Sequence, residues 1–337
     1  MKILVIDVAA QVGGAVTILE QFIEEFKKDK ENHYYVVLSV ITYANTDNIT
    51  FINCAWVKKS LIHRLYFDEI YIKNIIGKIK PDRILSLQNK TVAVKHIPQT
   101  VYYHNVLPIS NKRFSYQESK ELWFYQNAIG SIVKWSLNRA DSIIVQAGWI
   151  KKQLSDRWGI NERIIKVKPP VFDVEEVAPT IPDIAGLVLF YPANAAIYKN
   201  HQNLLLACKE IWKEYRSSFT LVLTGALDDF NKSCQDIIRD NIENIRLVGR
   251  LNKSQMLGYY KISTLIFPSY LETIGLPLIE AKESGSRILV SDCEYAHETL
   301  SDYQDVLFFD PFDINDIKAK ILEGLIIKKD CTNGNSI

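Results

Sequence analysis

The feature that most constrains the fold is an alternation of short apolar runs with longer amphipathic segments. Runs rich in Val, Ile and Leu predict strands at residues 2–8, 34–42, 82–87, 100–104, 141–146 and 163–168, then at 187–191, 219–224, 244–248, 264–267, 287–291 and 306–309. Helical patterns lie between them at residues 14–28, 68–79, 116–140, 200–215, 253–261, 277–284 and 313–327. This alternation is typical of a parallel sheet covered by helices.

A segment rich in proline and acidic residues interrupts the alternation at residues 169–183, PPVFDVEEVAPTIPD. Such a segment without periodicity is typical of a linker. The chain of 337 residues is long enough for about two domains. We therefore predict an α/β protein with a domain at residues 1–170, a linker at 171–185, a second domain at 186–327 and a frayed tail at 328–337. Both domains are expected to be doubly wound and Rossmann-like, facing each other across a crevice where a ligand binds.

Charge and composition exclude several classes of protein. Forty Lys and Arg residues against 39 Asp and Glu residues leave a net charge of +1, which argues against a nucleic-acid partner. The five cysteines have no metal or redox spacing and are expected to be reduced. No apolar run is long enough to span a bilayer, and the first residues are typical of a strand rather than a signal peptide. A cytoplasmic protein is expected.

The segment Ser263–Ser286, STLIFPSYLETIGLPLIEAKESGS, has the order of a strand, a turn and a helix start. Pro277 suits the first helical position, and the N–H groups of Ile274, Gly275 and Leu276 would then lie at the positive end of the helix. Gly275 would allow a ligand to approach closely. The segment therefore predicts an anion site, to which Thr273 also contributes.

The carboxylates of two glutamates in this segment can accept hydrogen bonds from hydroxyl groups in the same pocket. Glu272 is expected in the loop and Glu280 in the first turn of the helix, and carboxylates suit paired sugar hydroxyls. The alternative is that Glu272 is a solvated loop residue and that Glu280 only complements the helix dipole.

The spacing of two Glu residues in PSYLETIGLPLIEA resembles the signature of the large retaining glycosyltransferase family 4, which has the GT-B fold. The order of LVLFYPANAAIYKNHQNLL, FTLVLTG, SGSRILVSDC and VLFFDPFD is similar to that family, whereas the first half of the chain resembles it only loosely. The resemblance implies sugar transfer from a nucleotide sugar held mainly by the second domain. It also implies a saccharide or polyprenyl-diphosphate-linked acceptor, as in O-antigen or capsular polysaccharide biosynthesis.

By the same resemblance, Glu280 matches the ribose-binding position, Glu272 the position that contacts the donor sugar, and Lys199 the diphosphate-binding lysine. An ammonium group near a helix start can stabilise the charge on a departing diphosphate. Many family members carry an Arg a few residues earlier, where this chain has PANAA with Asn194. Arg250 is a candidate replacement or a surface cation, and Leu251 beside it would border the nucleobase.

The first domain offers weaker signals. Gly13 and Gly14 follow the first strand and could meet a phosphate or an acceptor hydroxyl, or could form only a tight turn. His104 ends a predicted strand and, by resemblance, would touch the donor sugar, with Asn105 beside it; the alternative is a buried structural histidine.

The predicted helix at residues 116–140 carries Trp123, Phe124, Tyr125 and Trp135 among several cations. Such a helix can lie on a membrane surface, aided here by Lys58, Lys59, Arg64, Lys112 and Arg113, or can face the core. We expect peripheral membrane contact at the inner face of the cell membrane as one use of this segment.

The catalytic residues predicted from these patterns are Lys199, Glu272 and His104. No paired aspartates follow a strand, so no essential metal and no cofactor beyond the nucleotide sugar are expected. By resemblance, the acceptor hydroxyl attacks on the side from which the diphosphate leaves. Two other functions stay open: a non-catalytic nucleotide-sugar-binding subunit, because the Arg is missing, and a sugar-nucleotide epimerase of the same architecture.

Overall fold

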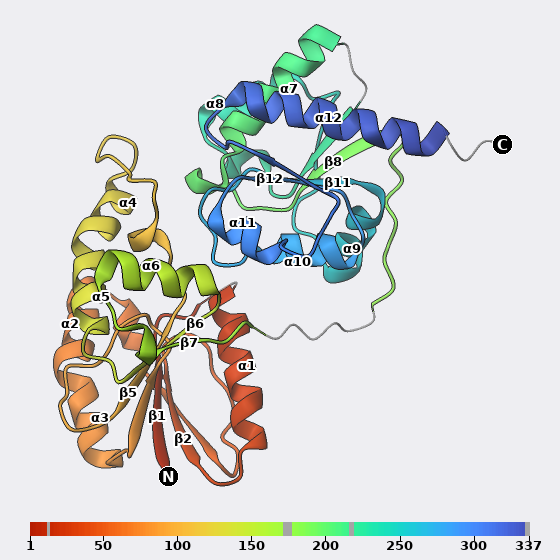
Figure 1. Cartoon of the computed structure of the whole chain (residues 1–337). Coiled ribbons are helices and arrows are strands. Elements are labelled where there is room, and N and C mark those ends of the chain that lie inside the picture. The colour runs from red at the N-terminus through yellow and green to blue at the C-terminus, as the bar shows by residue number, and fades with distance from the viewer. Residues whose placement is uncertain (12–13, 171–176, 216–218, 334–337) are drawn as a thin grey trace. The chain divides into compact units, whose positions relative to one another are not determined.

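The computed structural model describes residues 1–11, 14–170, 177–215 and 219–333 (Figure 1). The chain divides into two compact units, Met1–Asp173 and Val174–Ile337. Each unit is a parallel sheet with helices on both faces. The two-domain α/β prediction is therefore confirmed.

The sheet of the first unit has the strand order β3-β2-β1-β4-β5-β6-β7, and every pairing is parallel. Its strands are β1 (Lys2–Asp7), β2 (His33–Leu38), β3 (Ile49–Asn53), β4 (Arg83–Ser86), β5 (Gln99–Tyr103), β6 (Ser142–Val145) and β7 (Ile165–Val167). The order reverses between β1 and β4, so the chain leaves these neighbouring strands toward opposite sides.

The helices of the first unit are α1 (Gly14–Lys28), α2 (Leu61–Tyr66), α3 (Ile72–Ile79), α4 (Lys120–Phe124), α5 (Gly130–Leu137) and α6 (Gly148–Trp158). Its 3₁₀ turns are η1 (Ala55–Lys58), η3 (Leu107–Ile109) and η5 (Glu162–Ile164). Its π-helical turns are η2 (Phe67–Tyr71) and η4 (Tyr125–Ile129). Strand β1 sorts its side chains between the two faces by alternation. Val5 packs with Leu19 and Phe22 of α1, while Leu4 and Ile6 pack with Phe67 and Ile75 on the other face.

The sheet of the second unit has the strand order β10-β9-β8-β11-β12-β13 and is also parallel. Its strands are β8 (Leu187–Tyr191), β9 (Phe219–Leu223), β10 (Ile245–Leu247), β11 (Thr264–Phe267), β12 (Ile288–Ser291) and β13 (Val306–Phe309). Its helices are α7 (His201–Tyr215), α8 (Lys232–Asp240), α9 (Lys253–Ile262), α10 (Leu276–Glu283), α11 (Glu294–Thr299) and α12 (Ile314–Asn333), with the 3₁₀ turns η6 (Ile197–Lys199) and η7 (Leu227–Asp229). The order again reverses between the first and fourth strands, here β8 and β11.

Several predicted boundaries are wrong. The helix expected over residues 116–140 begins at Lys120, because the Ser119 hydroxyl accepts the N–H of Leu122, and it contains the turn η4 before ending at Leu137. Strand β2 ends at Leu38 rather than residue 42, because the Ser39 hydroxyl turns away to the Val8 carbonyl. The tail expected from residue 328 continues α12 to Asn333.

Some elements were missed altogether. Strand β3 and the helices α2, α6, α8 and α11 received no prediction. Helix α6 has only Ile150 and Leu154 as fully buried apolar residues, so its apolar stripe is too narrow to be read from the sequence. No helix in the described ranges is both long enough and apolar enough to cross a membrane.

Residues 177–185 belong to the predicted linker, and part of them packs on α9. Thr180 donates its N–H to the Ser254 carbonyl at 3.0 Å, and the two hydroxyls lie 2.7 Å apart. Gly258, one turn further along α9, lies directly under this segment. A Cβ atom at Gly258 would lie 1.8 Å from the Thr180 carbonyl oxygen, so only glycine allows this close approach.

We expect Gly258→Ala to lower the free energy of unfolding by about 1–3 kcal/mol, because the backbone of the Thr180 segment must shift. Gly77→Ala in α3 is the matched control, since a Cβ atom there meets nothing within 4 Å. The control should gain about 0.5–1 kcal/mol from helix propensity. Urea unfolding of both variants measures the difference, and equal stabilities would contradict the packing described here.

Candidate active site

The carboxyl ends of parallel strands lie at one edge of each sheet, and ligands of such sheets bind there, where the strand order reverses. In the second unit this point lies between β8 and β11, which pair through Leu189 and Thr264. The chain after β8 leads to Lys199, and the chain after β11 leads to Glu272. Two of the predicted catalytic residues therefore follow neighbouring strands.

Lys199 and Glu272 form an ion pair between the Lys199 Nζ and the Glu272 Oε1. Each side chain is only 15% exposed, so the two charges are largely withdrawn from water. A half-buried ion pair lasts only where its geometry is good, because both ions lose hydration. The structure thus brings these two predicted residues together.

Backbone contacts hold the two loops in place. The Tyr198 carbonyl accepts the N–H of Tyr270 at 3.1 Å and the hydroxyl of Ser269 at 3.3 Å. The buried Tyr191 hydroxyl donates to the Lys199 carbonyl at 2.7 Å. The loop after β8 is therefore tied both to its own strand and to the loop after β11.

The loop after β11 ends at the start of α10. Gly275 is the N-cap with φ of +66°, and a Cβ atom there would lie 3.0 Å from Leu278 Cδ1. Helix α10 begins at Leu276, so Pro277 is its second residue and not its first. Within the described residues, no protein acceptor takes the N–H groups of Ile274, Gly275 or Leu276. These amides at a helix N-terminus can bind an anion. Thr273 precedes them and is half-buried.

Glu280 lies in the second turn of α10, not the first as predicted, because the helix begins only four residues earlier. Its Oε2 accepts the Tyr260 hydroxyl at 2.8 Å. Burial raises the pKa of Glu280, while the hydrogen bond from Tyr260 acts in the opposite direction. No hydrogen bond or ion pair of the described chain joins Glu280 to the pair of Lys199 and Glu272.

The remaining predicted residues of the second unit lie in neighbouring loops. The exposed Asn194 accepts the N–H of Ala196 at 3.2 Å, so its oxygen shapes its own loop. Arg250 is exposed after β10, and it forms no ion pair within the described part of the chain. Leu251 follows it and is half-buried. No contact brings Arg250 to Lys199, and its role as a replacement cation stays a prediction.

In the first unit, His104 directly follows β5, which ends at Tyr103 and not at His104 as predicted. The backbone N–H of His104 donates to the Asn89 Oδ1 at 2.7 Å. The buried Nδ1 of the His104 ring has no partner in the described residues. Burial lowers the pKa of His104 to about 4, so the ring is neutral at neutral pH and can exchange hydrogen bonds but carries no charge. Asn105 donates to the Tyr125 hydroxyl at 2.8 Å and accepts the N–H of Leu107. Gly14 begins α1, and Gly13 lies outside the described residues.

Sequence reasoning missed Asp7, which ends β1 at the point where the strand order reverses in the first unit. Asp7 is 3% exposed, and its Oδ1 accepts the N–H of Ala10 at 3.1 Å. Burial raises the pKa of Asp7 to about 7, against the opposing pull of Lys58 and Arg64. The sequence indicated Asp7 only as the single acidic residue at the end of a mostly apolar strand.

Both units match family models of sugar-transferring enzymes. Residues 12–176 match Glycosyltransferase Family 4, and residues 183–333 match Glycosyl transferases group 1. The class defined by the fold is the two-domain α/β group of GT-B glycosyltransferases, as expected from the sequence. The chain belongs to the family 4 type within that class.

Three relatives illustrate the comparison. The chain is 23% identical to the O-antigen chain mannosyltransferase RfbU of Salmonella typhimurium over 221 residues, which cover 64% of this chain and 57% of that protein. It is 30% identical over 130 residues to an N,N'-diacetylbacillosaminyl-diphospho-undecaprenol alpha-1,3-N-acetylgalactosaminyltransferase of Campylobacter jejuni, covering 35% of this chain and 34% of that protein. The matched region thus spans about half or less of these curated relatives. Sucrose-phosphate synthase of Thermosynechococcus elongatus has a similar fold, with a TM-score of 0.70 at 18% identity, covering 96% of this chain and 90% of that one.

The raised pKa of Asp7 predicts how stability depends on pH. An unfolded aspartate titrates near pH 4, so the folded state binds the proton more tightly. The contribution of the protonated Asp7 is therefore complete below about pH 4 and is lost as the pH rises toward 7. Asp7→Asn keeps the acceptor for Ala10 and removes the titration. We expect the variant to become more stable than the wild type by up to a few kcal/mol between about pH 4 and pH 8.

Urea unfolding across this pH range measures the effect. Asp82→Asn controls for the loss of a carboxylate that accepts a backbone N–H, since the exposed Asp82 accepts from Lys2 at 2.7 Å. An Asp7→Asn curve that runs parallel to the wild-type curve would contradict a buried, protonated Asp7.

Proposed function

We propose that the chain is a retaining glycosyltransferase. It moves a sugar from a nucleotide-sugar donor to a saccharide or lipid-linked acceptor, in the assembly of a bacterial O-antigen or capsular polysaccharide. The observation that carries the proposal is the pair of Lys199 and Glu272 at the point where strand order reverses, close in sequence to the backbone amides of the α10 start. The names of the Salmonella and Campylobacter relatives support the pathway and the acceptor class.

The charges of this site suit a diphosphate. A diphosphate can replace the Glu272 carboxylate as the partner of Lys199 and accept the N–H groups of Ile274, Gly275 and Leu276. Glu272 is then released to accept the hydroxyls of the donor sugar. Lys199 and the amides stabilise the charge that grows on the departing diphosphate, so the leaving group needs no metal.

The remaining steps use hydrogen bonds to hydroxyl groups. The Glu280 carboxylate, held by Tyr260, accepts the ribose hydroxyls of the nucleotide. The acceptor hydroxyl attacks the anomeric carbon from the face that the diphosphate leaves, and a diphosphate oxygen takes its proton. Because its pKa is low, His104 contributes a hydrogen bond to a sugar hydroxyl and no positive charge.

The proposed cellular place is the cytoplasmic side of the membrane, in peripheral contact with it. Several large apolar side chains of the first unit are exposed, including Leu61, Ile62, Phe124 and Trp135. Residues 112–139 carry five cations and two carboxylates. An exposed apolar surface with basic neighbours is typical of proteins that lie on anionic membranes.

The donor is identified by thermal stabilisation with UDP-, GDP-, ADP- and dTDP-sugars. A donor at 100 times its dissociation constant adds about 2.7 kcal/mol to the native state. Analysis of the products with the chosen donor then separates the functions. Sugar joined to an acceptor supports transfer, whereas free epimerised donor without an acceptor would identify an epimerase.

We expect Lys199→Ala and Glu272→Ala to lower the transfer rate by about 10²–10³-fold, because the leaving diphosphate and the donor sugar each lose a partner. Lys209→Ala is the matched control, since Lys209 lies on α7 in an exposed pair with Asp240 at 3.5 Å. Circular dichroism verifies the fold of each variant. Full activity in both site variants would rule out the proposed roles, and donor binding without any transfer by the wild type would favour a non-catalytic binding subunit.

Metal independence is tested directly. Within the described ranges, no group of three or more His, Cys, Asp or Glu side chains could hold a metal ion. We expect the transfer rate to be unchanged by EDTA, because Lys199 and the α10 amides would neutralise the leaving group. Activity that EDTA abolishes and Mg²⁺ or Mn²⁺ restores would show that the diphosphate needs a metal.

A further inference from the structure

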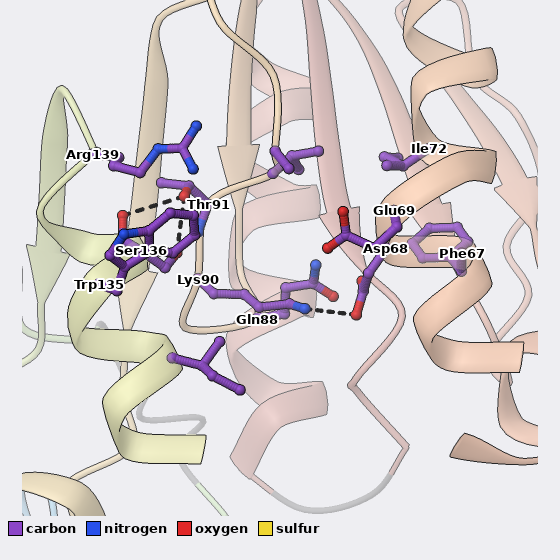
Figure 2. Close-up of a pocket in the computed structure, with 13 residues that line it drawn as sticks. Phe67, Asp68, Glu69, Ile72, Gln88, Lys90, Thr91, Trp135, Ser136 and Arg139 are labelled. Carbon is purple, nitrogen blue, oxygen red and sulfur yellow. Dashed lines mark hydrogen bonds and ion pairs between the residues drawn. The ribbon is translucent and has the colours of Figure 1, made fainter. Parts of the chain in front are cut away.

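A pocket in the first unit takes no part in the proposed transfer site. It lies between η2 and α3 on one side and α5 on the other, with the chain after β4 between them. Figure 2 shows Trp135, Ser136 and Arg139 on the α5 side and Phe67, Asp68 and Glu69 on the other.

The lining of the pocket carries two cations, Lys90 and Arg139, and two carboxylates, Asp68 and Glu69. Lys90 contacts Asp68 at 2.6 Å, and Asp68 also accepts the Arg64 Nε at 2.9 Å, so two cations share one buried carboxylate. The Arg139 guanidinium lies 4.6 Å over the Trp135 ring and has no carboxylate partner in the described part of the chain. Its N–H edge remains available, and a guanidinium binds phosphate with two parallel hydrogen bonds.

Hydrogen bonds attach the chain after β4 to α5. The N–H of Thr91 donates to the Ser136 Oγ at 2.6 Å, and the two hydroxyls lie 2.8 Å apart (Figure 2). Thr91 directly follows Lys90, and Ser136 lies one turn before Arg139. The two cations are therefore carried by segments that are attached to each other, which gives the pocket a defined geometry.

Exposed apolar side chains border the pocket. Ile132 and Trp135 line it and are 53% and 62% exposed. They lie three residues apart on α5, and Arg139 follows two residues after the helix ends at Leu137. Elsewhere in the first unit, Ile70 of η2 is 52% exposed, and Leu61 and Ile62 of α2 are exposed as well. Trp and Arg side chains beside exposed aliphatic groups are typical of surfaces at the lipid headgroup level.

We propose that this pocket binds the phosphate of an anionic glycerophospholipid in the bilayer surface. Arg139 and Lys90 contact the phosphate, and Ile132 and Trp135 enter the boundary with the acyl chains. The excess of cations over residues 112–139 is complementary in charge to such a surface. The inference rests on the proposed membrane contact and adds a specific lipid site to it.

The test is co-sedimentation of the full chain with phosphatidylcholine vesicles, with and without phosphatidylglycerol. We expect binding to require phosphatidylglycerol. Arg139→Gln should weaken it about fivefold, as expected for one charge worth about 1 kcal/mol at the surface. Trp135→Ala should weaken it as well. Arg83→Gln is the matched control, because Arg83 is exposed at the opposite, amino end of β4 and lies outside the pocket.

Three outcomes would overturn the proposal. Phosphatidylglycerol could fail to improve binding, or Arg83→Gln could weaken it as much as Arg139→Gln, which would indicate diffuse attraction only. Vesicles with polyprenyl phosphate could bind where phosphatidylglycerol of equal charge does not, which would assign the pocket to the acceptor carrier. Thermal stabilisation of the same variants by the nucleotide sugar is measured separately, so failure of the lipid site and failure of the transferase proposal are distinguishable.

Discussion

The ion pair of Lys199 and Glu272 depends on the parallel pairing of β8 with β11. Parallel pairing brings the ends of both strands to one edge of the sheet, and the reversal of strand order sends their loops apart on either side. The Tyr198 carbonyl then ties the loops back together through Ser269 and Tyr270. Only with this support can two half-buried charges keep their geometry. The start of α10 follows Glu272 by a few residues and is positioned by the same loop.

The first unit has the same architecture as the second, but the titratable groups near the reversal of its strand order are not an ion pair. Its strand order also reverses between the first and fourth strands, and burial near that edge favours the neutral forms of Asp7 and His104. Burial raises the pKa of Asp7 to about 7 and lowers the pKa of His104 to about 4. Neutral groups exchange hydrogen bonds with hydroxyls without a large cost of removing charge from water.

The sequence was sufficient for most of the fold because buried parallel strands are continuous apolar runs. Strands β8, β11 and β13 and helix α1 match in type and position. Strand β3 was missed because its run, ITFIN, is short and ends in polar residues. Of the site, the loop of Glu272 and Gly275 was predictable, because Gly275 and Pro277 shortly after a strand indicate a helix start. The contact of Glu280 with Tyr260 was not predictable, because the tyrosine lies on a different helix twenty residues earlier. Asp7 was missed because its pKa depends on burial by segments distant in the sequence.

The chain after β4 links the two sites proposed for the first unit. Asn89, with φ of +64°, accepts the N–H of His104 at the carboxyl edge of the sheet. Its neighbours on both sides, Gln88 and Lys90, line the pocket of Figure 2, where Arg64 reaches Gln88 at 2.7 Å. Successive residues of one short loop therefore contact the two sites. The loop that holds His104 through Asn89 is thus the same loop that carries Lys90 to Asp68.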